Sequence, residues 1–160
     1  MEKILAYHFV RDDGQRNQDG VVETIGKTYS AKGPLVMCKN GMHACERPLD
    51  ALNYGQGARL RCVECWGSVL KDGDKVVCRF RKPLWEIDAT MILHRFAIGE
   101  ARHALRATKV TDPRCWEALA VKQRWLVKKA TDAELGAARA AAWAAAWDAE
   151  SAAAKDAAKD

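Results

Sequence analysis

The chain has 160 residues and a mass of 17.7 kDa, the length of one ordinary domain with a sizeable core. Hydrophobic residues make up 49% of it and charged residues 29%, which excludes a wholly disordered chain, a collagen-like chain and a disulfide-dense miniprotein. The formal net charge of +5 permits attraction of nucleic acid, nucleotides or an acidic protein, but it singles out none of them.

The sequence carries no targeting signal that we recognise. No apolar run approaches the roughly 18 residues needed to cross a bilayer, and residues 1–10 lack the parts of a secretory signal. We therefore expect a cytoplasmic protein without a membrane partner. In that reducing compartment the six cysteines are expected to be thiols or metal ligands rather than disulfides.

The first part of the chain has the composition of short strands joined by turns, rich in Val, Ile, Cys, Tyr and Trp and punctuated by glycine. The pattern predicts a strand over Ile4–Val10 and a loop over Arg11–Gly20. A second strand is predicted over Val21–Tyr29, with an interruption near Gly26. This part of the chain is therefore expected to form a β-sheet.

Two short segments and a helix are predicted next. Leu35–Cys38 and Met42–Ala44 flank residues 39–41, where an Asn-Gly pair supplies the positive φ of a tight turn. Pro48 begins a short helix that ends at Tyr54, because proline suits the first helical position.

The residues from 59 to 81 form two alternating segments around the turn sequence 71–75, which predicts a β-hairpin. If the apolar face of this hairpin is buried, the other face carries four arginines: Arg59, Arg61, Arg79 and Arg81. We expect these arginines to lie together on an open face. Such a face is either a surface for an anionic ligand or a solvated face that keeps the sheet soluble.

Three helices are predicted in the second part of the chain. The first runs from Asp88 or Thr90 to about Thr108, and its apolar stripe is expected to pack on the sheet. A second begins at residues 111–113, where capping residues precede a proline. A third begins at Thr131 with a capping-box pattern.

The end of the chain is mostly alanine, which favours a helix but offers little to bury. Trp143 and Trp147 lie one turn apart and are expected to dock on the body of the domain or on another copy of the helix, giving a homodimer. The predicted fold class is α+β, an antiparallel twisted sheet followed by two or three helices. Residues 1–130 are expected to form one domain and residues 131–160 an alanine-rich helix.

A zinc-supported interaction module is one hypothesis from the cysteine content. The candidate ligands are Cys38, His43, Cys45, Cys62 and Cys65. Residues three apart on a strand point to opposite faces, so the sulfurs of Cys62 and Cys65 would diverge and buried thiols are expected instead.

Other catalytic patterns are weak. Cys45 and His43 form a candidate nucleophile pair because residues two apart on a strand share a face, yet nothing selects this pair over others. No glycine-rich phosphate loop, Walker lysine motif or dinucleotide fingerprint is present in the sequence.

Residues 39–54, 61–67 and 74–77 together resemble an uncharacterised domain family of phage and prophage proteins. The resemblance extends over about residues 6–97. Its most specific part is Gly-Met-His-Ala-Cys at 41–45. The resemblance implies a phage origin and a host-cell cytoplasm, and it brings no established activity.

A second, more distant resemblance is to small ADP-ribosyltransferases, including the rifampin-modifying type. It rests on a Tyr-His pair on an early strand, a Gly-x-His strand leading into Pro-Leu-Asp-Ala-Leu-Asn-Tyr, and a Val-Glu-x-x-Gly strand. This resemblance implies NAD as the cofactor and an antiparallel sheet as the fold.

In that family a strand histidine holds a ribose of NAD, an aromatic residue stacks on nicotinamide and a late acidic residue assists transfer. The resemblance assigns these roles to His8, to His43 or Tyr54, and to Asp74 or Glu86. His43 stands where a tyrosine is usual, which leaves open a non-catalytic version that still binds a nucleotide. The alternative for His8 is a strand histidine with a backbone partner.

The sequence therefore leaves one expected function and two alternatives to it. The first is a phage accessory protein that acts by binding, an inhibitor of a host defence system whose arginine face meets an anionic nucleotide, a host protein or a nucleoprotein complex. The second is NAD-dependent transfer of ADP-ribose to a host target. The third is the zinc-supported interaction module.

Overall fold

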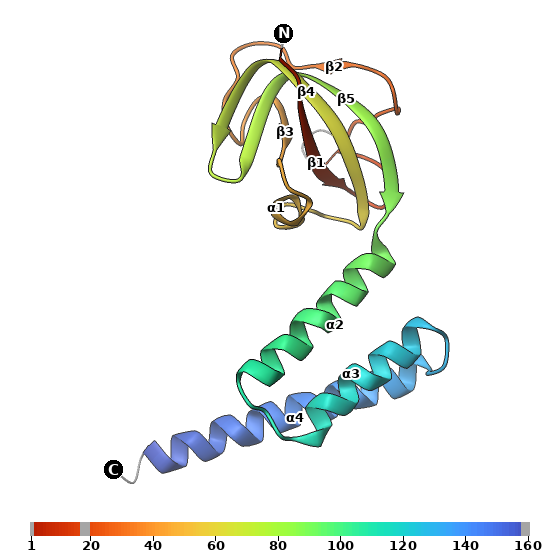
Figure 1. Cartoon of the computed structure of the whole chain (residues 1–160), viewed down its shortest axis with the longest axis vertical. Coiled ribbons are helices and arrows are strands. Elements are labelled where there is room, and N and C mark those ends of the chain that lie inside the picture. Colours follow the sequence, from red (N-terminus) through yellow and green to blue (C-terminus); the bar gives the residue numbers. More distant parts are fainter. Residues whose placement is uncertain (1, 17–19, 158–160) are drawn as a thin grey trace. The chain divides into compact units, whose positions relative to one another are not determined.

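The computed structural model describes residues 2–16 and 20–157, with side chains to residue 155. The chain divides into two compact units, Met1–Thr90 and Met91–Asp160. The predicted α+β class is confirmed: a five-stranded antiparallel sheet comes first and helices follow it (Figure 1). Within the described residues, no helix is both long enough and apolar enough to span a membrane.

The first unit holds five strands and one short helix. They are β1 (Ile4–Val10), β2 (Tyr29–Ser30), β3 (Met42–Ala44), α1 (Pro48–Leu52), β4 (Arg59–Asp72) and β5 (Lys75–Asp88). The predicted first strand, the hairpin and the helix that begins at Pro48 are confirmed. The hairpin turns at Gly73, whose φ of +57° is one that glycine adopts without strain.

The sheet is rolled, because the edge strand β1 meets the chain directly after β3. Its order is β1-β4-β5-β2, and β3 pairs with β5 as well. Tyr7 of β1 exchanges two backbone hydrogen bonds of 2.7 and 2.8 Å with Cys45, the residue directly after β3. The strands of the first unit therefore curve around a common interior (Figure 1).

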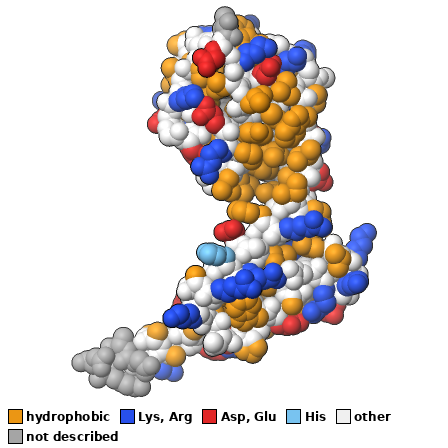
Figure 2. Space-filling model, viewed as in Figure 1, with side chains coloured by type: hydrophobic (Ala, Val, Ile, Leu, Met, Phe, Trp, Pro, Cys, Tyr) orange, Lys and Arg blue, Asp and Glu red, His pale blue; other side chains and the backbone are white. Residues whose placement is uncertain are grey.

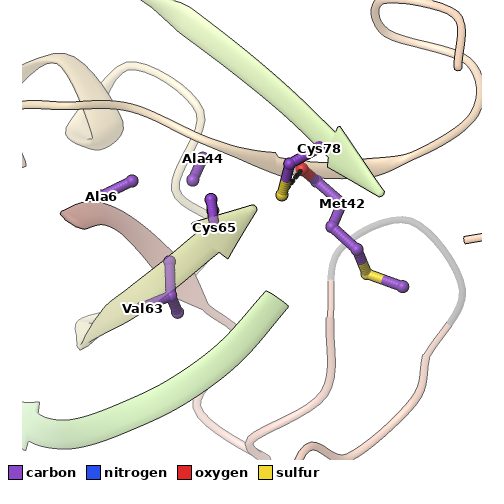
Figure 3. Close-up of a cluster of buried hydrophobic side chains, with 6 residues drawn as sticks. All are labelled: Ala6, Met42, Ala44, Val63, Cys65 and Cys78. Atoms are coloured by element: carbon purple, nitrogen blue, oxygen red, sulfur yellow. Dashed lines mark hydrogen bonds between the residues drawn. The ribbon is translucent and has the colours of Figure 1, made fainter. Parts of the chain in front are cut away.

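A small apolar core fills one part of that interior (Figure 3). It consists of Ala6, Met42, Ala44, Val63, Cys65 and Cys78. The Cys78 thiol donates to the Met42 carbonyl at 3.3 Å, so this buried thiol has a backbone acceptor. These residues come from β1, β3, β4 and β5, and their burial holds the four strands together.

The expected open arginine face is wrong for Arg61 and Arg81. Val63 and Cys65 lie on the same face of β4 as Arg61 and are completely buried, so this face points into the rolled sheet. Arg61 and Arg81 are each only 3% exposed. The expected inner face is buried, since Leu60, Cys62, Val76 and Cys78 are at most 9% exposed. The roll of the sheet also encloses the face that carries these arginines, so only the expectation that this face is open is wrong.

The other two arginines also have partners. Arg59 bonds to the Glu86 carboxylate, and Arg79 donates 2.7 Å hydrogen bonds to the carbonyls of Ala31 and Gly33. Arginines that are already bound to carboxylates and carbonyls do not form a free cationic surface.

Two predicted strands are absent from the described residues. Between Val21 and Tyr29 the chain turns at Gly26, whose φ is +82° and whose N–H donates to the Pro83 carbonyl at 2.7 Å. Only the last of these residues enters β2. The segment before β3 is a turn instead of a strand, and it places Cys38 at a φ of +61°.

The second unit is helical. It contains α2 (Thr90–Ala107), α3 (Pro113–Leu126) and α4 (Asp132–Ala157), in agreement with the three predicted helices. The Asp112 carboxylate caps α3 by accepting from the Arg114 N–H at 2.8 Å. Whether the apolar stripe of α2 packs on the sheet remains a prediction.

The capping box of α4 is confirmed. Thr131 Oγ1 accepts from the Glu134 N–H at 3.2 Å, and the Glu134 carboxylate accepts from the Thr131 N–H at 2.7 Å. Leu135 and Ala145 lie on the buried side of α4, whereas Trp143 is 79% exposed. Docking of the tryptophans on the sheet unit or on a second copy remains a prediction.

Candidate functional site

A pocket opens in the first unit, with a cavity volume of about 210 Å³. This volume is smaller than the roughly 300–1,000 Å³ of common ligand pockets, so the pocket suits a small molecule. Its lining comes from β1, the turn before β3, β3, α1, β5 and the segment after β1, and consists of Tyr7, His8, Phe9, Arg16, Cys38, His43, Ala44, Cys45, Ala51, Tyr54, Lys75 and Arg81.

The inner wall of the pocket is built around one buried carboxylate. The Glu23 side chain has no exposed surface, and its oxygens lie 2.7 Å from Arg81 Nη2 and 3.4 Å from Arg61 Nη1. Arg16 Nη1 lies 3.3 Å from the same carboxylate. Glu23 offsets the charge of arginines that would otherwise repel one another in a poorly hydrated interior.

Arg81 forms part of this wall and is held from two sides. Its Nη1 donates to the His43 carbonyl at 2.5 Å, while its Nη2 donates to Glu23. The Nε atom is buried and has no hydrogen-bond partner among the described residues. A buried N–H of a charged group without an acceptor is costly, and a ligand oxygen would remove that cost.

His8 lies beside Arg81 on the same wall. It is paired across the sheet with Arg61, and its Nε2 atom is 3.7 Å from Glu23, which is too long for a hydrogen bond. Burial and the nearby charge of Arg81 hold the pKa of His8 well below its ordinary value of 6.5. His8 is therefore neutral at neutral pH, and its buried Nε2 has no partner within the part of the chain that the structure describes.

His43 lines the pocket from β3 with a fixed tautomer. Its Nε2 accepts from the Cys38 N–H at 2.9 Å, and its Nδ1 lies 3.1 Å from the Gly41 carbonyl. Nδ1 therefore carries the proton and donates to that carbonyl. Burial lowers the pKa of His43, so the ring is neutral and acts as a structural acceptor for the turn.

Tyr54 and Lys75 form the outer rim. Tyr54 is 44% exposed, and its hydroxyl donates to the Asp74 carboxylate at 2.9 Å. Lys75 Nζ lies 4.3 Å from the centroid of the Tyr54 ring and 3.4 Å from Cys38 Sγ. The hydrogen bond to Asp74 raises the pKa of Tyr54, and the contact with Cys38 raises the pKa of Lys75.

Glu86, one of the two acids that the ADP-ribosyltransferase resemblance suggests, lies outside the pocket lining. Its carboxylate accepts from Arg59 Nε at 2.8 Å and from Arg61 Nε at 2.6 Å. Burial alone would raise the pKa of Glu86, but the two arginines outweigh it and hold the pKa below its ordinary value. Asp74, the other suggested acid, meets Tyr54 at the rim.

The structure thus brings together three of the residues that the ADP-ribosyltransferase resemblance suggests: His8, His43 and Tyr54. Their functional roles remain predictions. Sequence reasoning missed Glu23, because a lone glutamate in a presumed strand carries no local signal. It also missed Lys75, although this lysine ends the predicted turn next to Asp74.

The candidate zinc ligands do not assemble into a site. Among the described residues, no group of three or more His, Cys, Asp and Glu side chains has an arrangement that could hold a metal ion. Cys45 is buried, and this burial raises the pKa of its thiol to about 11. The pairing of Cys45 with His43 as a nucleophile is therefore unfavourable, because the thiol stays protonated.

The surface of the first unit also carries apolar side chains. Figure 2 shows hydrophobic side chains gathered over part of the sheet unit. Leu5, Trp85 and Ile87 are between 40% and 56% exposed. These side chains are absent from the pocket lining.

Comparison with known proteins gives one match. A family model described as Domain of unknown function (DUF7666) matches residues 4–95, which is more than half of the chain and includes every residue that lines the pocket. No curated protein matches the chain, and no solved structure matches it.

Proposed function

Since the chain belongs to the family described as Domain of unknown function (DUF7666), which assigns no activity, we propose a function from the pocket itself. The first unit is a binding module for a small phosphorylated molecule of the nucleoside monophosphate class. Its phosphate lies against Arg81 and Lys75, and its ring lies near Tyr54. The predictions of a phage origin and a host-defence target concern the partner and are separate from this ligand proposal.

The observation that carries the proposal is the buried guanidinium of Arg81. Its Nε is aimed at no acceptor among the described residues, and the neighbouring buried Nε2 of His8 has none either. Both side chains line the pocket. A phosphate oxygen at this wall would accept from Arg81, and charge-assisted bonds of this kind contribute about 1.5–3 kcal/mol each.

The charge of the lining supports an anionic ligand. Arg16, Lys75 and Arg81 contribute cationic groups, and none of the twelve described lining residues is acidic. Behind the wall, the single Glu23 carboxylate is shared by Arg16, Arg61 and Arg81, so it offsets only part of their charge. The pocket therefore attracts negative charge more strongly than a surface of mixed charge would.

The other part of the lining is aromatic and apolar. Tyr7, Phe9 and Ala51 line the pocket, and Tyr54 stands at the rim with Lys75 over its ring. A planar base stacks favourably on such a ring at about 1–3 kcal/mol per base. A cavity of about 210 Å³ suits a mononucleotide better than a dinucleotide such as NAD, most of which would extend outside.

Binding is favoured over ADP-ribose transfer. Transfer needs an acidic group at the reacting ribose. Glu86 is bound by Arg59 and Arg61 outside the pocket lining, and Asp74 is absent from that lining as well. His8 and Tyr54 line the pocket, where they would position a nucleotide without that acid.

The test is titration calorimetry with AMP, GMP, CMP and UMP, each compared with its nucleoside. We expect at least one monophosphate to bind about tenfold or more tightly than its nucleoside, because the phosphate adds charge-assisted hydrogen bonds. Equal affinity for nucleotide and nucleoside, or no binding by any of the four monophosphates, would contradict the proposal.

Variants connect the binding to this pocket. Lys75→Gln removes a rim cation without opening the core and is expected to weaken monophosphate binding by about tenfold. Lys71→Gln is the matched control in the same hairpin, because Lys71 is exposed, pairs with Glu46 and does not line the pocket. Equal losses in the two variants would place binding outside the pocket.

A further inference from the structure

The rim of the pocket carries an exposed cysteine in an unusual backbone position. Cys38 has a φ of +61°, a conformation that residues other than glycine rarely adopt. Its N–H donates to His43 Nε2 at 2.9 Å, and its Sγ lies 3.4 Å from Lys75 Nζ. The sulfur is thus held beside an ammonium group and remains open to solvent.

The other cysteines lack this combination. Cys45, Cys62, Cys65 and Cys78 are buried. Burial raises the pKa of the Cys62 thiol, as it does for Cys45. Cys115 is half-buried and does not line the pocket. Reactive cysteines occupy partly exposed, electropositive places, and Cys38 meets both conditions.

A second observation, at Arg81, favours an anionic ligand in this same pocket. Arg81 is 3% exposed, lines the pocket with Cys38, and has a buried Nε without a hydrogen-bond partner among the described residues. An anionic molecule that meets Arg81 is brought close to the sulfur of Cys38, because both side chains line a cavity of only about 210 Å³.

We propose that Cys38 is a redox-reactive thiol that forms a mixed disulfide with a small anionic disulfide bound in the pocket. The class of reactant is an alkyl disulfide that carries carboxylates. This inference rests on the proposed function in one respect, which is that the pocket attracts anions. Its consequence is regulatory, because the attached group fills the cavity and excludes the nucleotide.

The exchange is balanced without a further oxidant. Cys38 loses its proton to solvent, and its thiolate attacks one sulfur of the disulfide. A bond forms between Cys38 Sγ and that sulfur while the original S–S bond breaks. The other half leaves as a thiolate with the bonding electron pair and takes up a proton from solvent. Lys75 stabilises the attacking thiolate by its positive charge.

The test uses two disulfides of matched size and opposite charge, 3,3′-dithiodipropionate and cystamine. The folded full-length protein reacts with each under pseudo-first-order conditions, and mass spectrometry of peptides reports the modified cysteine. Each rate is divided by that of a neutral model thiol, N-acetylcysteinamide. We expect Cys38 to favour the anionic reagent by roughly tenfold or more, since a cationic cleft raises the local concentration of anions.

Four variants interpret the rates. Cys38→Ser removes the fast reaction, and Cys115→Ser leaves it unchanged. Lys75→Gln abolishes most of the preference for the anionic reagent, whereas Lys71→Gln retains it. Lys75 and Lys71 lie in the same hairpin, but only Lys75 lines the pocket. Both lysines lie beside a turn and neither is buried, so these variants are expected to fold.

The outcomes separate this inference from the proposed function. If Cys38 reacts no faster than Cys115 while a nucleoside monophosphate binds, the inference is wrong and the proposed function stands. If Cys38 reacts selectively with the anionic reagent but no nucleotide slows the reaction, the exchange at Cys38 stands, whereas the proposed function and the regulatory consequence both fail. Equal normalised rates for the two reagents overturn the anion-guided exchange.

Discussion

Glu23 and Arg81 form an ion pair inside the first unit, with 2.7 Å between Oε1 and Nη2 and at most 3% exposure of either residue. The two residues are 58 positions apart in the chain. This contact joins the segment after β1 to the strand β5, and Arg81 also lines the pocket.

Replacement of Glu23 tests the importance of that carboxylate for stability. Glu23→Gln leaves Arg61 and Arg81 buried with less negative charge, so we expect the free energy of unfolding to fall by about 3–5 kcal/mol. Chemical denaturation measures the change. Glu64→Gln is the control, because Glu64 pairs with Lys3 near the surface and its loss costs only about 0–1 kcal/mol. Similar effects of the two changes would contradict the buried cluster.

Lowering the pH should destabilise the first unit already at pH values higher than those at which carboxylates titrate. The pKa of His8 is lowered in the folded state, so the unfolded state binds a proton first as the pH falls below about 6.5. The stability contributed by neutral His8 is present above pH 6.5 and falls by up to about 1.4 kcal/mol per pH unit below it.

Denaturation between pH 7.5 and 5 measures this slope. His8→Gln should flatten it, and His103→Gln should leave it unchanged because His103 is exposed on α2. A slope that is the same in wild type and His8→Gln would show that His8 is not the titrating group.

The turn before β3 depends on Gly41. Its φ is +137°, and a Cβ added there would collide with the Val77 side chain. Gly41→Ala should therefore reduce stability by about 2–4 kcal/mol, the sum of backbone strain and overpacking. Gly73→Ala is the comparison, since its φ is +57° but no atom lies within 4 Å of the added Cβ; about 1–2 kcal/mol is expected there. A smaller loss for Gly41→Ala than for Gly73→Ala would contradict this packing.

The tryptophans of α4 should contribute little to the stability of the isolated monomer. Trp143 is 79% exposed and Trp147 is 71% exposed, so Trp143→Ala and Trp147→Ala should each change the free energy of unfolding by about 0.5 kcal/mol or less. Leu135→Ala, on the buried side, should cost about 2–5 kcal/mol. Thermal or chemical unfolding at low concentration distinguishes the two faces. A large loss from either tryptophan change would show that the residue is covered in solution.

The local features of the fold could be predicted from the sequence, because they depend on neighbouring residues. The caps at Asp112 and Thr131 and the turn at Gly73 are examples. The burial of Arg61 and Arg81 could not be predicted, because it depends on Glu23, which is 38 and 58 positions away in the chain. The alternation of side chains identifies two faces of a strand, but tertiary packing decides which face is enclosed.

The candidate site was predictable only in part. His8, His43 and Tyr54 were suggested by resemblance, and the structure places them in the same pocket lining. Lys75 and Cys38 meet across the rim only because the turn before β3 folds toward the β5 strand, a long-range contact that local patterns do not contain.

The central claim is that a nucleotide phosphate enters the pocket of the first unit, and the chain's four histidines provide a direct measurement. His8 and His43 line the pocket, whereas His94 and His103 lie on α2. Imidazole nitrogen resonances are followed by NMR while the tightest-binding nucleoside monophosphate is added. We predict saturable shifts for His8 and His43 with His94 and His103 unchanged. Unmoved pocket histidines, or equal shifts of all four, would contradict the account.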